Sequence, residues 1–266
     1  MARGTWSVRG LWAAAGALGA VVVLTLYVLL SGGGDEGSGK DAAPDGGGKP
    51  SRAASASPSP SYTVPDDWSE PQRWAALPRA RTTDRYGSQV GFPHTPDGAA
   101  AMAVASNSVT IEGDTSGVDE QTRIYHSYVG SGDQSPGAAE RVEQAAEKAD
   151  KKLAEEMGVA PGQALPSGAY MRSHVIGFKV VEGSADEMAM WVLARTTTKR
   201  GETAKETGAY SRTLVGLQWQ DGDWKITGDA TKWAMQRAEG KTEPKIVAVG
   251  DEEFNTSGWT AIREAS

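Results

Sequence analysis

Cysteine is absent from this chain of 266 residues, and phenylalanine occurs only three times. Without a thiol the chain has no disulfide, thiolate metal site, iron–sulfur cluster or cysteine nucleophile, and there is no cysteine to acylate in a lipoprotein. The absence leaves the compartment open, because export does not require disulfides. It does imply that an exported domain of this chain is held together by packing alone.

Positive charge is also in deficit, because 34 acidic residues outnumber 27 basic ones and the net charge is -7. Residues 1–66 carry five charges of each sign, so the whole negative excess falls on the other 200 residues. An acidic surface is poorly attracted to DNA or to anionic lipid headgroups. We therefore expect no direct nucleic-acid binding, and protein partners are the more natural expectation.

A third absence is local, since the segment from Leu11 to Leu30 contains no charged residue. Twenty helical residues span roughly 30 Å, the thickness of a bilayer core, so this segment is predicted to be a transmembrane helix. A cleaved signal peptide is the alternative, but its apolar region usually has about 7 to 15 residues and ends in a small-residue cleavage site. The apolar run here continues into Ser31 without such a site, which favours an uncleaved anchor.

The charges on either side of this segment predict its orientation. Arg3 and Arg9 precede it, whereas the first charges after it are acidic. Positive charge beside a membrane span favours the cytoplasmic side. We expect a cytoplasmic N-terminus over residues 1–10, a single-pass helix over 11–30 in the cell membrane, and an extracytoplasmic C-terminal domain.

Residues 31–66 consist mostly of Gly, Ser, Pro, Ala and Asp, and no large apolar residue occurs before Tyr62. Such a segment buries too little surface to offset its ordering entropy, so it is predicted to be a disordered linker. Its typical end-to-end distance is roughly 30 to 35 Å. An α+β domain over 67–228 would follow, then a C-terminal extension over 229–266. That extension either packs on the domain or extends from it, and its PKIVAV segment is a candidate strand.

Three helices are predicted in the first half of the domain. Thr95 and Ser135 are each followed by proline, as at many helix starts, and Ser116 with Asp119 matches a capping box. Gly158 follows the last apolar residue of the third helix, whose other face is charged and therefore lies on a surface. The predicted extents are 95 to about 111, 116 to about 129, and 135 to 157.

Four strands are predicted after Pro166, because aromatic and β-branched residues cluster there between short turn-forming loops. Asp221 and Gly222, between Trp219 and Trp224, predict a tight hairpin. Short connections imply antiparallel neighbours, and helices that precede an antiparallel sheet are typical of an α+β domain with helices on one face. The predicted strands cover residues 170–181, 188–198, 209–220 and 224–228.

This order of elements, ending in WQDGDWKITG at residues 219–228, resembles the nuclear transport factor two-like fold, in which a curved sheet wraps around helices and a final W-x-x-G-x-W hairpin is common. With the predicted anchor and linker, the chain resembles the TcpC-like inner-membrane assembly components of type IV secretion and conjugation machines. The segment GFPHTPDGAAAMAVASN, residues 91–107, is also similar to membrane-anchored proteins of actinobacterial conjugative elements. The resemblance implies a non-enzymatic structural subunit that contacts other secretion or conjugation membrane proteins, with a homo-oligomer as a further option.

Two alternatives stay open. One is an envelope accessory protein of the same fold, of the type associated with lipid importers. The other is a ligand carrier or isomerase, because the cone inside such a sheet can enclose a small molecule. An isomerase needs a buried carboxylate and an oxyanion donor, but the central residues of the predicted strands include no Asp or Glu. We therefore expect no enzymatic activity and no cofactor.

The histidines at positions 94, 126 and 174 match no metal-binding spacing, so no metal site is expected. His174 alternates with Tyr170 and Phe178 along the first predicted strand, which allows it to face the cone. The tryptophans of the strands either fill the core or, where one faces outward, anchor an interface. The candidates for a pocket or an interface are His174, Tyr170, Tyr210, Trp191, Trp219 and Trp224.

Overall fold

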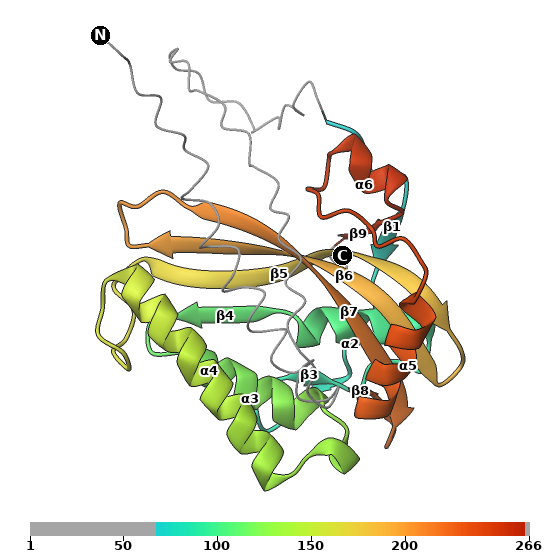
Figure 1. Ribbon diagram of the computed structural model, residues 1–266, viewed down its shortest axis with the longest axis horizontal. Coiled ribbons are helices and arrows are strands. Elements are labelled where there is room, and N and C mark those ends of the chain that lie inside the picture. Colours follow the sequence, from blue (N-terminus) through green and yellow to red (C-terminus); the bar gives the residue numbers. More distant parts are fainter. Residues whose placement is uncertain (1–67, 264–266) are drawn as a thin grey trace.

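Three long antiparallel strands form the centre of a curled sheet (Figure 1). The computed structural model describes residues 68–263, and the predicted anchor and linker lie outside them. The sheet order is β1-β9-β5-β6-β7-β8, and β4 pairs with β5 on the same side as β9 does, nearer the start of β5. The predicted α+β class is confirmed. The strands are β1 (Trp74–Ala76), β4 (Val109–Glu112), β5 (Ala169–Gly183), β6 (Glu187–Arg200), β7 (Thr207–Gln220), β8 (Asp223–Ile226) and β9 (Thr260–Arg263).

The four strands predicted after Pro166 are confirmed as β5 to β8, with ends that differ by at most two residues. Asp221 and Gly222 have φ angles of 52° and 82°, the pair of positive values that a type I′ hairpin turn requires. Trp219 therefore pairs directly with Trp224 across the hairpin. A small separate hairpin of β2 (Thr82–Thr83) and β3 (Gln89–Val90) precedes these elements.

Three helices pack on one face of the sheet: α2 (Pro96–Ser106), α3 (Gly117–Tyr128) and α4 (Pro136–Met157). The predicted N-caps Thr95 and Ser135 both accept backbone N–H groups of their helices, and both bonds of the capping box at Ser116 are present. Gly158 ends α4 in the left-handed conformation with φ 73°, as a glycine C-cap does.

The first helix is shorter than predicted, because it ends at Ser106 and residues 109–112 form β4 instead. Val109 and Ile111 are buried while Thr110 and Glu112 are exposed, which is the two-residue period of a strand. β-branched residues at three of these four positions favour that conformation, and β4 pairs with β5. Because the preceding residues are rich in alanine, a strong helix former, the change from helical to strand periodicity at residue 109 was not predicted.

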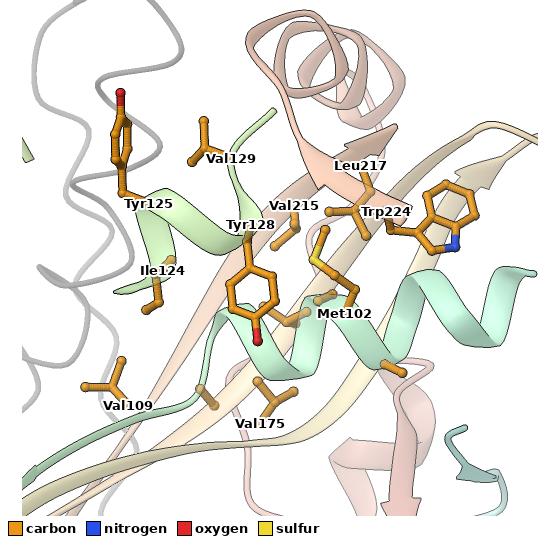
Figure 2. Close-up of a cluster of buried hydrophobic side chains, with 14 of the residues drawn as sticks. Met102, Val109, Ile124, Tyr125, Tyr128, Val129, Val175, Val215, Leu217 and Trp224 are labelled. Carbon is orange, nitrogen blue, oxygen red and sulfur yellow. The ribbon is translucent and has the colours of Figure 1, made fainter. Parts of the chain in front are cut away.

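The core between the helices and the sheet is built around α2. Alanines 99, 100 and 103 have at most 1% of their surface exposed, so the helix lies close to the strands. Figure 2 shows Met102 of α2 pointing toward Val215 and Leu217 of β7, with Tyr128 of α3 and Trp224 of β8 on either side. Met102 and Trp224 have no exposed surface, so the space under the curled sheet at this place is filled with side chains.

The opposite face of the sheet, called here the outer face, is also partly covered, which corrects the prediction that all helices lie on one face. Helices α5 (Gly228–Ala238) and α6 (Glu252–Thr256) and the segment between them pack there. At Gly216 of β7 an added Cβ atom would lie 2.1 Å from the carbonyl oxygen of Ala230 in α5. The absence of a side chain at this position lets the helix approach the strand.

The PKIVAV segment, residues 244–249, does not form the strand considered for it. It crosses the outer face, where Val247 is buried with Leu193 and Phe254, and the Pro244 carbonyl accepts a hydrogen bond from Arg212. The C-terminal strand is β9 instead. It lies between β1, to which it is parallel, and β5, so residues 229–263 complete the sheet.

Gly216→Ala should lower the free energy of unfolding by about 1–3 kcal/mol, since the new methyl group would overlap the backbone of α5. The measurement is denaturant unfolding of the full chain in mild detergent, followed by tryptophan fluorescence. Gly132→Ala is the control, because a Cβ atom there meets nothing within 4 Å and its effect should stay within about 0.5 kcal/mol. Equal losses in the two variants would contradict the close approach.

Asp119→Ala tests the capping box through its pH dependence. Hydrogen bonds from the Ser116 hydroxyl and backbone N–H lower the pKa of Asp119 below its ordinary value of 3.8. A lowered carboxyl pKa contributes stability that is present above the ordinary pKa and disappears as the pH falls through the folded-state pKa. We expect a loss of roughly 0.5 kcal/mol at pH 7, small because the side chain is exposed, that vanishes in acid. Asp114→Ala is the control: this side chain lies at an exposed turn outside the capping box, so its removal should change the free energy of unfolding by less than about 0.5 kcal/mol.

Candidate interaction surface

The six candidate residues separate into two groups on opposite sides of the sheet. Trp219 and Trp224 lie at the β7–β8 hairpin on the side of α2. The other four lie on the outer face, in β5, β6 and β7: Tyr170, His174, Trp191 and Tyr210.

Trp224 is a core residue, and its indole Nε1 donates a hydrogen bond of 2.9 Å to the carbonyl oxygen of Pro93. Trp219 packs edge-on against it and is itself stacked by the His94 ring, with centroids 4.0 Å apart. The Nε2 atom of His94 lies 2.9 Å from a carboxylate oxygen of Asp186. These contacts join the loop before α2 to the β5–β6 turn, which is a structural role for His94.

His174 faces away from the helices, because the alternation assumed along β5 is broken. A β-bulge at Ile176 adds one residue between Val175, which pairs with Ala194, and Gly177, which pairs with Leu193. Phe178, after the bulge, is buried in the core beside the helices, while His174, before it, is exposed on the outer face. The interpretation that His174 lines a cone is therefore wrong.

The outer face has two halves of different character. In one half, Trp191 and Leu193 of β6 are covered by the C-terminal segment, whose Val247, Phe254 and Trp259 are at most 4% exposed. The other half carries no such covering among residues 68–263. We call this half the open face; its residues are Tyr170, Arg172 and His174 of β5, Arg195, Thr197 and Lys199 of β6, and Tyr210 of β7.

Cross-strand register brings the residues of the open face together. Arg195 pairs with His174 on one side and with Tyr210 on the other, and Lys199 pairs with Tyr170. Paired residues of adjacent antiparallel strands have Cβ atoms about 4.5–5.5 Å apart. The open face is therefore a continuous surface of aromatic and basic side chains on the projecting ends of the long strands.

On the β5 side of the open face, Tyr170 and Arg172 make defined contacts. The guanidinium group of Arg172 lies 4.1 Å from the centroid of the Tyr170 ring and forms an ion pair with Glu112 of β4. The Tyr170 hydroxyl donates a hydrogen bond to the Glu206 carboxylate, and this bond raises the pKa of Tyr170. Glu112 lies on β4 beside β5, and Glu206 directly precedes β7, so the two acidic residues lie on opposite sides of β6 and the Tyr170–Glu206 hydrogen bond crosses that strand.

The middle of the open face carries basic side chains without acidic partners. Within the part of the chain that the structure describes, no carboxylate lies within 4.0 Å of the side-chain nitrogens of His174, Arg195 or Lys199. His174 and Arg195 are exposed, and Lys199 is half-buried. In a chain with a net charge of -7, such a local excess of positive charge is a distinct electrostatic feature.

Arg195 and Lys199 were not among the sequence-derived candidates, although the sequence contains a signal for them. Residues 188–194 of β6 are uninterruptedly apolar, which is typical of a strand buried on both faces. Residues 195–200 are then Arg, Thr, Thr, Thr, Lys and Arg, with no apolar residue among them, which indicates that burial on both faces ends there. The change at residue 195 marks the start of the open face.

Other kinds of site have less basis in these residues. Between positions 68 and 263 no three His, Asp or Glu side chains are grouped so that they could bind a metal ion. The three histidines have separate surroundings: His94 stacks on Trp219, His126 stacks on Tyr86 and His174 lies on the open face. The same range contains no helix with the length and apolar character needed to cross a bilayer.

Phe254→Ala tests whether the C-terminal segment is integral to the domain. Phe254 has no exposed surface and packs beneath Gly177 of β5, so its truncation should cost about 3–5 kcal/mol of unfolding free energy. Met235→Ala in α5, where the side chain is 37% exposed, provides the control and should cost well under half as much. Chemical denaturation measures both; a small loss at Phe254 would mean that the covering segment is not part of the folded unit.

Comparison with known proteins yields no match for this chain among family models, curated proteins or solved structures.

Proposed function

We propose that this protein is a membrane-anchored, non-enzymatic subunit that acts through protein–protein contacts of its α+β domain, in a conjugation or type IV secretion apparatus. The observation that carries the proposal is the open face, a continuous aromatic and basic surface on the ends of β5, β6 and β7. Tyr and Arg are enriched at the energetic centres of protein interfaces. The predicted helix over residues 11–30 would supply the membrane attachment, and the predicted orientation would place the domain outside the cytoplasm.

The arrangement of the domain also supports the finer hypothesis of a nuclear transport factor two-like fold. A curled sheet packs around α2, α3 and α4, and the Trp219–Trp224 hairpin closes it. The proposed relatives would differ from this chain in the outer face, since α5, α6 and the segment between them add a second layer over half of the sheet.

The ligand-carrier and isomerase alternative has less support. Its main candidate, His174, faces away from the helices. On the helix side, Met102, Tyr128 and Trp224 are almost completely buried and fill the region where a ligand would lie. The alternative of a lipid-importer accessory protein shares the fold and the mode of action, and differs only in the partners that it predicts.

The proposal is tested by purifying the tagged full chain from native membranes in mild detergent. We expect a stoichiometric complex whose other members are membrane proteins of a conjugation or secretion machine, because the open face is expected to bind protein. Recovery with lipid-transport permease subunits would favour the accessory-protein alternative. A lone monomer that retains a small molecule would contradict both, and quantitative mass spectrometry of the purified material distinguishes these outcomes.

A further inference from the structure

We propose that the open face binds an extended, carboxylate-rich segment of a partner protein, with Arg195 and Lys199 as its main contacts. The inference rests on the proposed function and adds the chemistry of the partner. Arg195 and Lys199 lie on the same face of β6, four residues apart, which at 3.3 Å per residue is roughly 13 Å. An extended segment places alternate side chains on one side at the same spacing, so acidic residues at positions i and i+4 match the two cations.

The outer face already binds one extended segment of this chain through an arginine–carboxylate pair. Arg212 of β7, two residues from Tyr210, pairs with the Glu243 carboxylate and donates a hydrogen bond to the Pro244 carbonyl oxygen. The guanidinium group also lies 5.1 Å from the centroid of the Trp191 ring, which fixes its orientation. Arg195 lies on the same face, next to Tyr210, and has no carboxylate within 4.0 Å among the described residues. The open face thus continues a surface on which an arginine binds the carboxylate of a passing segment.

A second copy of this chain, facing the first across the open face, is disfavoured by charge. Such a contact would oppose Arg195 and Lys199 of one copy to the same residues of the other, and like charges in apposition cost energy. A flat anionic membrane is disfavoured for a different reason. A flat anionic surface laid on the open face would meet the exposed residues Glu112 and Glu206, whereas a single segment can place its carboxylates at Arg195 and Lys199.

The test measures the affinity of the full chain, in non-ionic detergent, for a fluorescein-labelled decapeptide of alternating Glu and Ser. Fluorescence anisotropy should show saturable binding that weakens several-fold when the salt concentration rises from 50 to about 200 mM. Arg195→Glu with Lys199→Glu should weaken binding at least tenfold. Lys151→Glu with Lys152→Glu makes the same charge change on the exposed face of α4, beyond the other side of the sheet, and should change it less than twofold.

A neutral pair, Arg195→Gln with Lys199→Gln, should give an intermediate loss, and its melting curve checks that the fold is intact. Equal losses in the α4 control, or no saturable binding, would overturn the inference. The inference would also be overturned if the wild-type chain bound phosphatidylglycerol vesicles but not the peptide, and if the Arg195→Glu and Lys199→Glu variant lost that vesicle binding.

Recovery of the native complex separates this inference from the proposed function. A wild-type chain without protein partners contradicts the function itself. A complex that forms normally with the Arg195→Glu and Lys199→Glu variant leaves the function intact and overturns only the open face as its site. Loss of the complex in that variant, with recovery in the α4 control, supports both.

Discussion

Between Met188 and Ala194 the central strand β6 is apolar on both faces, and the rest of the domain is arranged around the need to cover both. Met188, Met190 and Val192 pack against α2 and its neighbours, while Leu193 on the other face packs against Val247, Phe254 and Trp259. A sheet with one apolar face needs a single layer of helices, whereas this one needs two layers. The C-terminal segment supplies the second.

The covering stops where the side chains change. From Arg195 onward the outer face of β6 is polar, and its neighbours in β5 and β7 are His174 and Tyr210. The bulge at Ile176 lies at the same level of the sheet, where it shifts the alternation of β5 and lets Phe178 enter the core. The boundary between the covered half and the open face is therefore set by two neighbouring strands, by the polar residues of β6 and by the bulge in β5.

Local signals in the sequence predicted those elements whose ends are chemically marked. Two helices were predicted from such marks: α3 from the capping box at Ser116, and α4 from the proline after Ser135 and from Gly158 after its last turn. The hairpin was predicted from Asp221 and Gly222. The prediction of a long first helix was wrong because alanine has high helix propensity and the strand period of β4 lasts only four residues.

The covering layer and the open face depend mostly on tertiary contacts, which caps, turns and propensities do not report. Thr227 is the N-cap of helix α5, and its hydroxyl accepts a hydrogen bond from the Ala230 N–H. The predicted last strand, residues 224–228, nevertheless ran through this cap. His174 and Phe178 point to opposite faces because a bulge adds one residue to β5 between them. The β-branched and aromatic residues around the bulge contain no local sequence signal that predicts it. The apolar run of β6 did indicate two-sided burial, and it is the signal from which the covering layer could have been inferred.

The charges of the outer face explain why one half of it is covered by the C-terminal segment and the other half is left for a partner. Burying an arginine requires a partner, and Arg212, whose side chain is 19% exposed, has one in Glu243 of the covering segment. Arg195 lies beyond that segment and remains hydrated, so it carries no desolvation cost until something covers it. A partner that covers it must bring its own carboxylate for the same reason that Glu243 accompanies Arg212. The specificity for an acidic segment thus follows from the rule that already determines how the C-terminal segment packs on the sheet.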